Sequence, residues 1–592
     1  MIFYDFEVFK NDWLVVLIDP INKKQFTIIN NPDELEKIYN EYKKDIWVGY
    51  NSRNYDQYIL KAILCGFNPK DMNDHIIKYK QYGFTFSSLL IRYPLINYDV
   101  AMINDGGLKT LEGYLGNNIK ETSVPFDIDR KLTDEEIIET VQYCTHDVEQ
   151  TIEVFLLRKS EFESQMDLIN TFKLPLFKVG KTKVQLTADI LEAKRWYEWN
   201  DEFDITIPTT LRIEKYKDIL NWYKNPLNRD YNKKLKIEVA GVPHLFAWGG
   251  LHGGRKKYYS EGYFINVDVA SYYPALMIEY DYLSRNVKDK SKYVNIRDTR
   301  LELKAKKDPK QQPFKIVLNG CYGAMKDKNN NLYDPLMANN VCVSGQLFLL
   351  DLIEKLEPYA EIIQSNTDGI LIKMPSRFTD KNSWFNLIDD ICLEWENRTK
   401  MKLEFDEFVK VYQKDVNNYV IIDRLGNYKS KGSYVKKLNS LDYDLPIVNK
   451  ALINYLLKKI PVEKTINECN ELKEFQKIVK VSSKYSYGLY NPKIELKKIR
   501  DTSGKLKTVK IFSGGEKLNE KCFRVFASID NINDGTIYKV KNENKNPEKF
   551  ADTPEVCFIY NHNINDEAVN IKLNKKWYIE LAKKRLRDFG VM

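Results

Sequence analysis

Alternating apolar and polar residues predict a strand at the start of the chain. Between residues 2 and 9, aromatic and aliphatic residues alternate with acids. Asp5 and Glu7 lie two positions apart, so their side chains project from the same face of this strand. An isolated pair of this kind is typical of a solvated edge strand. Further acids elsewhere in the sequence are needed before the pair indicates a metal site.

A second group of strands is expected in the middle of the chain. Residues 263–269 are of strand-forming types, and Ser271 and Pro274 then suit the cap and first turn of a helix. The runs 361–365 and 370–373 flank a four-residue turn ending in glycine, which predicts a hairpin.

Two helices are predicted between these strands. Lys315, Asn319 and Tyr322 follow one another at helical spacing, so one face carries all three. Arg300 and Lys304 are four apart and share a face of an earlier helix. Two such helices would present cations toward a triphosphate and an aromatic ring toward a base.

Two carboxylates end up beside each other if the predicted strands pair. Asp268 ends the strand 263–269, and Asp368 lies in the hairpin turn. Carboxylates crowd at strand ends when a cation offsets their repulsion. Two hard metal ions held this way can position an in-line attack on a phosphate.

Composition narrows the class of protein. The 592 residues suffice for several domains, and 43% hydrophobic with 29% charged residues is typical of a soluble globular protein. A net charge of +8 permits a polyanionic partner without requiring one. The eight cysteines form no C-x-x-C pair, and the first seven residues contain acids where a signal peptide has an apolar run, so we expect a cytoplasmic protein. No stretch approaches the roughly 20 apolar residues of a membrane span.

Three segments in order resemble motifs A, B and C of family B DNA polymerases. They are Asp268-Val-Ala-Ser-Tyr-Tyr-Pro274, Lys315-Ile-Val-Leu-Asn-Gly-Cys-Tyr-Gly323 and Asn366-Thr-Asp-Gly369, against D-x-x-S-L-Y-P, K-x-x-x-N-S-x-Y-G and D-T-D-S. The resemblance implies that Asp268 and Asp368 are catalytic metal ligands, together with Val269 as a further ligand. Tyr272, Gly320, Asn366 and Gly369 depart from the pattern, and Asn366 replaces a secondary carboxylate.

The N-terminal third resembles the proofreading exonuclease of the same family. Asp5 and Glu7, then Asp56, then Tyr143 and Asp147 follow the order of its Exo I, II and III motifs. The resemblance makes the four acids metal ligands and gives Tyr143 the role of orienting the attacking water. It further implies that Asn51 and Tyr55 contact the single-stranded 3′ end. His146 is interpreted as helix surface or packing, and Asp99 as a turn or cap residue.

The resemblance implies an α/β (α+β) multidomain fold, with an RNase H-like exonuclease domain followed by a right-hand polymerase of palm, fingers and thumb. The expected boundaries are exonuclease 1–185, linker and first palm segment 186–285, fingers 286–330, second palm segment 331–444, and thumb with C-terminal region 445–592.

Further roles carried over from the family concern nucleotide and DNA. Nucleotide binding is implied for Arg300, Lys304, Lys315, Asn319, Tyr322 and Tyr273, the last as the ring that excludes a 2′-hydroxyl. DNA binding is implied for Trp248, Gly249 and Gly250, near a Y-x-G-G type motif, and for Lys410 and Tyr412, in a K-x-Y motif. A tight turn with a solvated basic flank is the alternative at 248–257, and a core aromatic is the alternative for Tyr273.

The hypothesis is a DNA-directed DNA polymerase with a 3′→5′ exonuclease. It would use two Mg²⁺ per active site, with Mn²⁺ as a substitute, and bind primer–template DNA and dNTPs as a monomer without a membrane. Only 41 positions separate Pro274 from Lys315 and 43 separate Gly323 from Asn366, which leaves little room for the insertions of protein-primed relatives. A nucleic-acid primer and a phage or mobile-element origin are therefore expected, with a phage helicase, primase and single-strand binding protein as candidate partners. The alternatives are a DNA-binding scaffold without chemistry and an exonuclease whose polymerase is impaired by Asn366.

Overall fold

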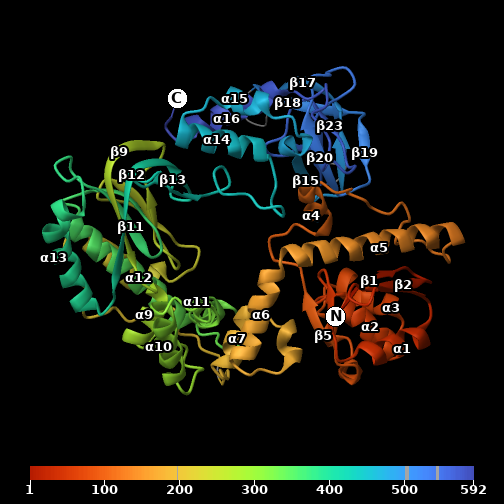
Figure 1. The fold of residues 1–592 in the computed structure, drawn as a ribbon, viewed down its shortest axis with the longest axis horizontal. Coiled ribbons are helices and arrows are strands. Elements are labelled where there is room, and N and C mark those ends of the chain that lie inside the picture. The colour runs from red at the N-terminus through yellow and green to blue at the C-terminus, as the bar shows by residue number, and fades with distance from the viewer. Residues whose placement is uncertain (197, 501–505, 542–545, 592) are drawn as a thin grey trace.

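The chain is a mixed α/β protein with several sheets, described by a computed structural model for residues 1–196, 198–500, 506–541 and 546–591. Figure 1 shows the N-terminal part (red to orange) at the lower right, the central part (yellow to green) at the left and the C-terminal part (blue) at the top. Helices α6 (Lys159–Thr171), α7 (Lys183–Ile190) and α8 (Lys217–Lys224) lie between the first part and the second in sequence.

The N-terminal part has a five-stranded sheet in the order β3-β2-β1-β4-β5. Strands β1, β2 and β3 are antiparallel neighbours, whereas β4 and β5 run parallel to β1. Helix α5 packs on β1 and β2. The elements are β1 Ile2–Val8, β2 Trp13–Asp19, β3 Lys24–Ile29, α1 Pro32–Tyr42, β4 Ile46–Gly49, α2 Asp56–Leu64, α3 Pro69–Asn73, β5 Ile96–Asp99, α4 Leu108–Leu115 and α5 Asp134–Leu157.

The central part has a nine-stranded sheet in the order β14-β13-β12-β9-β11-β10-β8-β7-β6. It draws its strands from both sides of the α10–α11 hairpin in sequence. The elements are β6 Leu235–Val239, β7 Val242–Phe246, β8 His252–Gly254, β9 Tyr258–Val269, α9 Tyr272–Glu279, α10 Ser291–Ala305, α11 Gln311–Lys326, α12 Pro335–Leu356, β10 Glu361–Ser365, β11 Gly369–Lys373, α13 Lys381–Thr399, β12 Leu403–Asp415, β13 Asn418–Ile422 and β14 Tyr428–Lys431.

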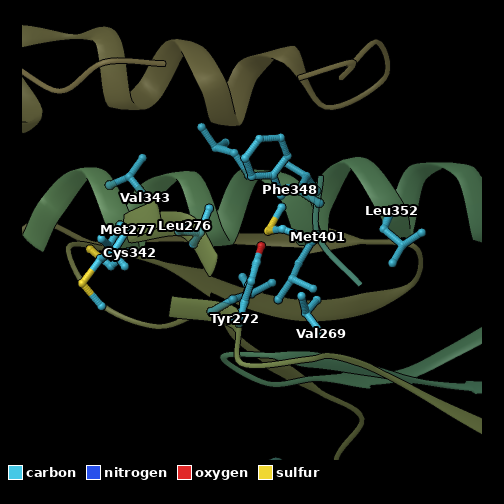
Figure 2. Packing of buried hydrophobic residues seen from close by; sticks show 14 of the residues in the cluster. Val269, Tyr272, Leu276, Met277, Cys342, Val343, Phe348, Leu352 and Met401 are labelled. Carbon is cyan, nitrogen blue, oxygen red and sulfur yellow. The ribbon is translucent and has the colours of Figure 1, made fainter. Parts of the chain in front are cut away.

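Helix α12 forms the centre of the largest hydrophobic core. Figure 2 shows Tyr272 reaching from the start of α9 toward α12, among Leu276, Phe348 and Met401. The hydroxyl of Tyr272 donates to the carbonyl of Gly345 in α12 at 2.7 Å. Because α9 follows directly on β9, this packing fixes the end of β9 and the side chain of Asp268.

The same helix corrects one expectation. By length and composition α12 could span a membrane, which the sequence had not indicated, but 94% of its apolar window is buried inside the protein. A buried core helix passes the same test as a membrane span. Its apolar residues therefore serve the core.

The described residues of the C-terminal part form helices and small antiparallel sheets, one of them the two-stranded sheet β17-β18. These two strands pair antiparallel, with Lys493 opposite Ser513 and Leu496 opposite Lys510. The elements are α14 Pro446–Lys458, α15 Val462–Glu468, β15 Lys477–Lys480, β16 Tyr487–Tyr490, β17 Lys493–Arg500, β18 Leu506–Ser513, β19 Glu516–Leu518, β20 Cys522–Ala527, β21 Ile537–Val540, β22 Glu548–Lys549, β23 Cys557–Ile559 and α16 Lys575–Asp588.

Candidate active sites

The predicted strand and hairpin of the central sheet lie side by side. Strand β9 pairs antiparallel with β11, and Asp268 is directly opposite Gly369. The amide of Val269 donates to the carbonyl of Asp368 at 2.7 Å, and the amide of Asn366 closes the turn on the carbonyl of Gly369 at 2.8 Å. The two acids of the expected metal pair therefore meet at the end of β9. We call this place the Asp268 site.

Electrostatics at the Asp268 site favour a cation. Burial, and then the nearby carboxylate of Asp368, raise the pKa of Asp268 to about 6. The amide of Asn266 donates to Asp268 at 2.6 Å, which leaves the other carboxylate oxygen for a ligand. Two carboxylates with oxygen ligands nearby fit Mg²⁺ or Mn²⁺.

Two acids that sequence reasoning missed lie on the same sheet face. Glu404 of β12 is directly opposite Asp268, and Asp406 is opposite Asn266. Directly opposed residues of antiparallel strands share a face, so these acids extend the negative face of the site. Acids alternating with apolar residues after Leu403 were the only sequence signal, and it does not reveal the partner strand.

Cations approach this face from α10 and β14. Lys304 of α10 lies 3.2 Å from Glu404, and Lys429 of β14 lies 2.7 Å from Asp406. Arg300 is 8% exposed and donates to the hydroxyl of Ser271 at 2.8 Å. The predicted helix pairing of α10 with α11 is confirmed. Lys315 and Asn319 are exposed on α11.

Ser271 does not cap α9 as expected. Its backbone takes a left-handed conformation with φ of 49°, and its side chain makes no capping hydrogen bond. The hydroxyl instead accepts from Arg300. The residue thus links the end of β9 to α10.

Tyr273 and Tyr322 form an aromatic pair beside the Asp268 site. Their ring centroids are 4.5 Å apart with an interplanar angle of 59°, and both side chains are partly buried. Tyr273 comes from α9 and Tyr322 from α11. A ring held in this way has a fixed position, which a steric role toward a sugar requires.

The residues expected to bind DNA occupy different environments. Trp248 is 5% exposed and packs against Phe203 and Tyr223 in the core, so its ring is not available to a DNA strand. Gly250 lies against the hairpin turn, since a Cβ there would be 2.6 Å from the hydroxyl of Thr367. Gly249 has open space at its Cβ position.

The K-x-Y segment lies in β12, next to the C-terminal part. Tyr412 is fully buried, stacks on Tyr259 at 4.8 Å and accepts a hydrogen bond from Lys459 at 2.8 Å. Lys410 pairs with Glu261 at 2.7 Å. Lys459 belongs to the turn after α14, so Tyr412 links the central sheet to the C-terminal helices.

The N-terminal acids gather around β1, in what we call the Asp5 site. The ligand atoms of Asp5, Glu7 and Cys144 lie within 4.8 Å of one another. Asp56, at the start of α2, accepts from the amide of Phe6 at 3.2 Å. Helix α5 contributes Tyr143 and Asp147.

The carboxylates of the Asp5 site are buried, and the neighbouring positive charge does not balance them. Burial raises the pKa of Asp5 and of Glu7, with neighbouring carboxylates adding to the effect. It raises the pKa of Asp56 to about 7 and that of Asp147 to about 6. Crowded buried carboxylates of this kind fit hard divalent cations with oxygen ligands.

One lysine that sequence reasoning missed offsets part of this charge. Lys109 of α4 bonds Asp147 and lies 3.0 Å from the fully buried Glu112. Its ammonium group is 4.6 Å from the ring centroid of Tyr143. His146 lies 3.6 Å from Glu112 and belongs to the packing around it, as expected.

The flanking residues of the Asp5 site have local partners. Asp99 accepts from the amides of Asn51 and Arg53 at 2.8 and 3.1 Å, which confirms its turn role. Asn51 itself is exposed, and the hydroxyl of Tyr55 donates to Asn73 at 2.8 Å. Both residues precede Asp56, at the entrance to α2.

No protein-family model and no curated protein matches this sequence. Among solved structures, the chain is similar to the family B DNA polymerase from the hyperthermophilic archaeon Pyrobaculum calidifontis. The similarity covers 100% of this chain and 78% of that chain, with 14% identity and a TM-score of 0.41. A likeness of this degree assigns neither family nor activity.

Proposed function

We propose that this chain is a template-directed DNA polymerase with a 3′→5′ proofreading exonuclease. The polymerase proposal rests on the pairing of β9 with β11. This pairing places Asp268 opposite Gly369, and the Val269 amide donates to the carbonyl of Asp368. It supports a two-carboxylate metal site at the end of β9.

The chain's own residues supply the rest of the polymerase site. Lys304, and Lys315 on the facing helix, neutralise the triphosphate, and Arg300 braces the start of α9 through Ser271. Tyr273, held by Tyr322, lies under the sugar and excludes a 2′-oxygen. Asp268 and Asp368 would hold Mg²⁺, which would activate the primer 3′-hydroxyl and offset charge on the α-phosphate.

The proposed exonuclease is the Asp5 site. Asp5, Glu7, Asp56 and Asp147 would hold two Mg²⁺, and Tyr143 would orient the attacking water. Asp5 and Glu7 lie in one cluster of candidate ligands, and Asp147 lies in a second. Lys109 holds Asp147 and restrains the ring of Tyr143. The two sites lie on different sheets, so each can be inactivated alone.

We further propose replication of phage or mobile-element DNA from a nucleic-acid primer, because the short gaps between the three motifs leave little room for protein-priming insertions. A labelled primer–template with Mg²⁺ tests both activities. With dNTPs the primer should lengthen, and without them it should shorten from its 3′ end. A primer unchanged in length under both conditions contradicts the proposal.

A further inference from the structure

We infer, independently of the two activities proposed above, that the central part has a separate binding site for a nucleoside phosphate. A cavity of about 890 Å³ is lined by residues of β9, β11 and β12 and of the turn after β13. The turn between α12 and β10 and the segment before α13 complete its wall. We call this place the Arg424 cavity.

The Arg424 cavity lies at the end of the central sheet that is remote from the Asp268 site. Strand β11 begins at Gly369, directly opposite Asp268, and ends at Lys373, which lines the cavity. Tyr263, also in the lining, is five residues from Asp268 along β9, or roughly 17 Å at about 3.3 Å per residue. A ligand in the cavity therefore leaves the Asp268 site free.

An irregularity in β9 shapes this end of the sheet. Between residues 408–410 of β12 and the facing residues 261–264 of β9, β9 has one residue more than its partner. Gly262, in this bulge, has φ of 143°, a conformation that glycine tolerates and other residues rarely adopt. A Cβ there would be 3.0 Å from Cε of Lys373. Bulges and glycines within strands often mark places where side chains are redirected or a ligand approaches the backbone.

Two cations of the lining have no acidic partner. Lys373 and Arg424 both line the cavity, and within the described part of the chain neither forms an ion pair. The ammonium group of Lys373 donates to the hydroxyl of Ser260 at 2.6 Å, and the guanidinium group of Arg424 lies 5.3 Å from the ring centroid of Tyr263. Both contacts position the cations without cancelling their charge.

The acids of the lining are neutralised from outside the cavity. Each forms an ion pair with a cation that does not belong to the lining: Glu261 with Lys410 at 2.7 Å, Glu357 with Lys215 at 2.8 Å, and Glu361 with Arg255 at 3.3 Å. The charge of Arg424 and Lys373 thus remains to attract an anion. An arginine can bind two phosphate oxygens at once, and a lysine beside it adds a point charge.

An exposed aromatic ring accompanies the cations. Tyr359 is 43% exposed in the turn between α12 and β10, and the partly buried Phe378 lines the same cavity. Rings of this kind stack on nucleobases of any type. Pockets of roughly 300–1,000 Å³ enclose most of a small ligand, so the cavity has room for one nucleotide. A nucleoside phosphate combines the anion that Arg424 and Lys373 attract with a flat ring for Tyr359.

The test is calorimetric titration of the full-length protein with adenosine 5′-monophosphate, in EDTA so that no metal ion assists binding. We expect the wild type to bind it more tightly than it binds inorganic phosphate or adenosine. Arg424→Gln with Lys373→Gln should raise Kd at least about tenfold, since losing a hydrogen bond to a charged group costs this much or more. Tyr359→Ala should raise Kd for the monophosphate and leave Kd for inorganic phosphate unchanged, whereas Tyr359→Phe should bind as the wild type does.

Two control variants locate the binding. Lys584→Gln with Arg587→Gln, at exposed positions of α16, removes the same two kinds of charge and should leave Kd unchanged. Lys304→Gln with Lys315→Gln removes the cations proposed to bind a triphosphate and should also leave Kd unchanged. Retained binding in this second control distinguishes the Arg424 cavity from the proposed polymerase site.

Three results would overturn the inference. They are wild-type affinity in Arg424→Gln with Lys373→Gln, no binding of the monophosphate by the wild type, and equal Kd values for the monophosphate and inorganic phosphate. A wild-type protein that binds the monophosphate but extends no primer overturns the proposed polymerase and leaves the Arg424 cavity as a nucleotide site.

Discussion

Gly369 gives Asp268 the space that a side chain would take. A Cβ at this position would be 1.7 Å from Oδ1 of Asp268, which no pair of atoms tolerates. The carboxylate would have to rotate away, and the proposed metal site would lose its geometry. The residue therefore belongs to the site although it has no functional group.

Gly369→Ala should lower the rate of primer extension by about 100-fold, since a misplacement of about 1 Å can cost that much. Single-turnover incorporation of one dNTP measures the effect. Degradation of a single-stranded oligonucleotide by the same variant is the internal control and should stay at the wild-type rate. Wild-type extension would mean that Asp268 is not held as the structure has it.

Tyr273→Ala should raise incorporation of ribonucleotides relative to deoxyribonucleotides. The ring packed on Tyr322 fills the space of a 2′-oxygen, and removing it opens that space. Incorporation of dNTP and rNTP opposite one template base gives the ratio. Tyr273→Phe keeps the ring and should keep the wild-type ratio. If the alanine variant has the wild-type ratio as well, Tyr273 is only a packing residue.

The raised pKa values of the Asp5 site predict a pH effect on stability. The pKa of Asp56 is about 7 in the folded protein, against about 4 for an ordinary aspartate. The folded chain keeps this proton where the unfolded chain has lost it, so the stability contribution is full below about pH 4 and falls as the pH rises toward 7.

In EDTA, the Tm of the wild type should therefore fall more steeply from pH 5 to pH 7 than that of Asp56→Asn. Added Mg²⁺ should raise the wild-type Tm at pH 8, because a cation relieves the repulsion that deprotonation creates. Calorimetry with and without the metal measures both effects. Parallel Tm profiles for the two proteins would show that Asp56 does not titrate in this way.

At the scale of elements, local signals were sufficient for the strands and helices of the central site. Strand β9, the β10–β11 hairpin and α11 follow from residue type, glycine position and helical spacing, all of which act over a few residues. Pairing between β9 and β12 is long-range, so Glu404 could not be assigned to the Asp268 site from sequence. Trp248 was missed as a core residue for the same reason, since its aromatic neighbours come from residues 203–223.

Lys109 illustrates the same limit at the Asp5 site. Helix α4 is a short helix with no motif, and its lysine reaches Asp147 of α5 only because both helices pack together. The order of the acids was enough to predict the ligand set. The cation that balances it depends on tertiary structure.

Strand β20 contacts helix α4 through the buried guanidinium group of Arg524, so replacing this residue should lower the stability of the protein. Arg524→Met should lower the free energy of unfolding by roughly 3 kcal/mol or more, because several buried carbonyls lose their donor at about 1–3 kcal/mol each. Urea unfolding measures it, with Lys576→Met at an exposed position as the matched control. A change in the free energy of unfolding below about 0.5 kcal/mol would show that Arg524 does not make these contacts in solution.

At the scale of the whole molecule, the two acidic sites lie on separate sheets with separate cores, and the C-terminal part touches both. It contacts the central sheet through Lys459 on Tyr412 and the N-terminal part through Arg524 on α4. The C-terminal part therefore contacts both of the parts that carry an acidic site. This arrangement agrees with a protein that makes and trims the same strand.

The most direct test of the account is single-nucleotide incorporation at the Asp268 site, in an Asp5→Ala and Glu7→Ala background that removes trimming. We predict that this background adds the complementary dNTP with Mg²⁺, that Asp368→Asn lowers the rate by about a hundredfold to a thousandfold, and that Asn366→Asp, a carboxylate two residues away, retains activity. Incorporation at an undiminished rate by Asp368→Asn, or none by the background protein with either Mg²⁺ or Mn²⁺, would contradict the polymerase site.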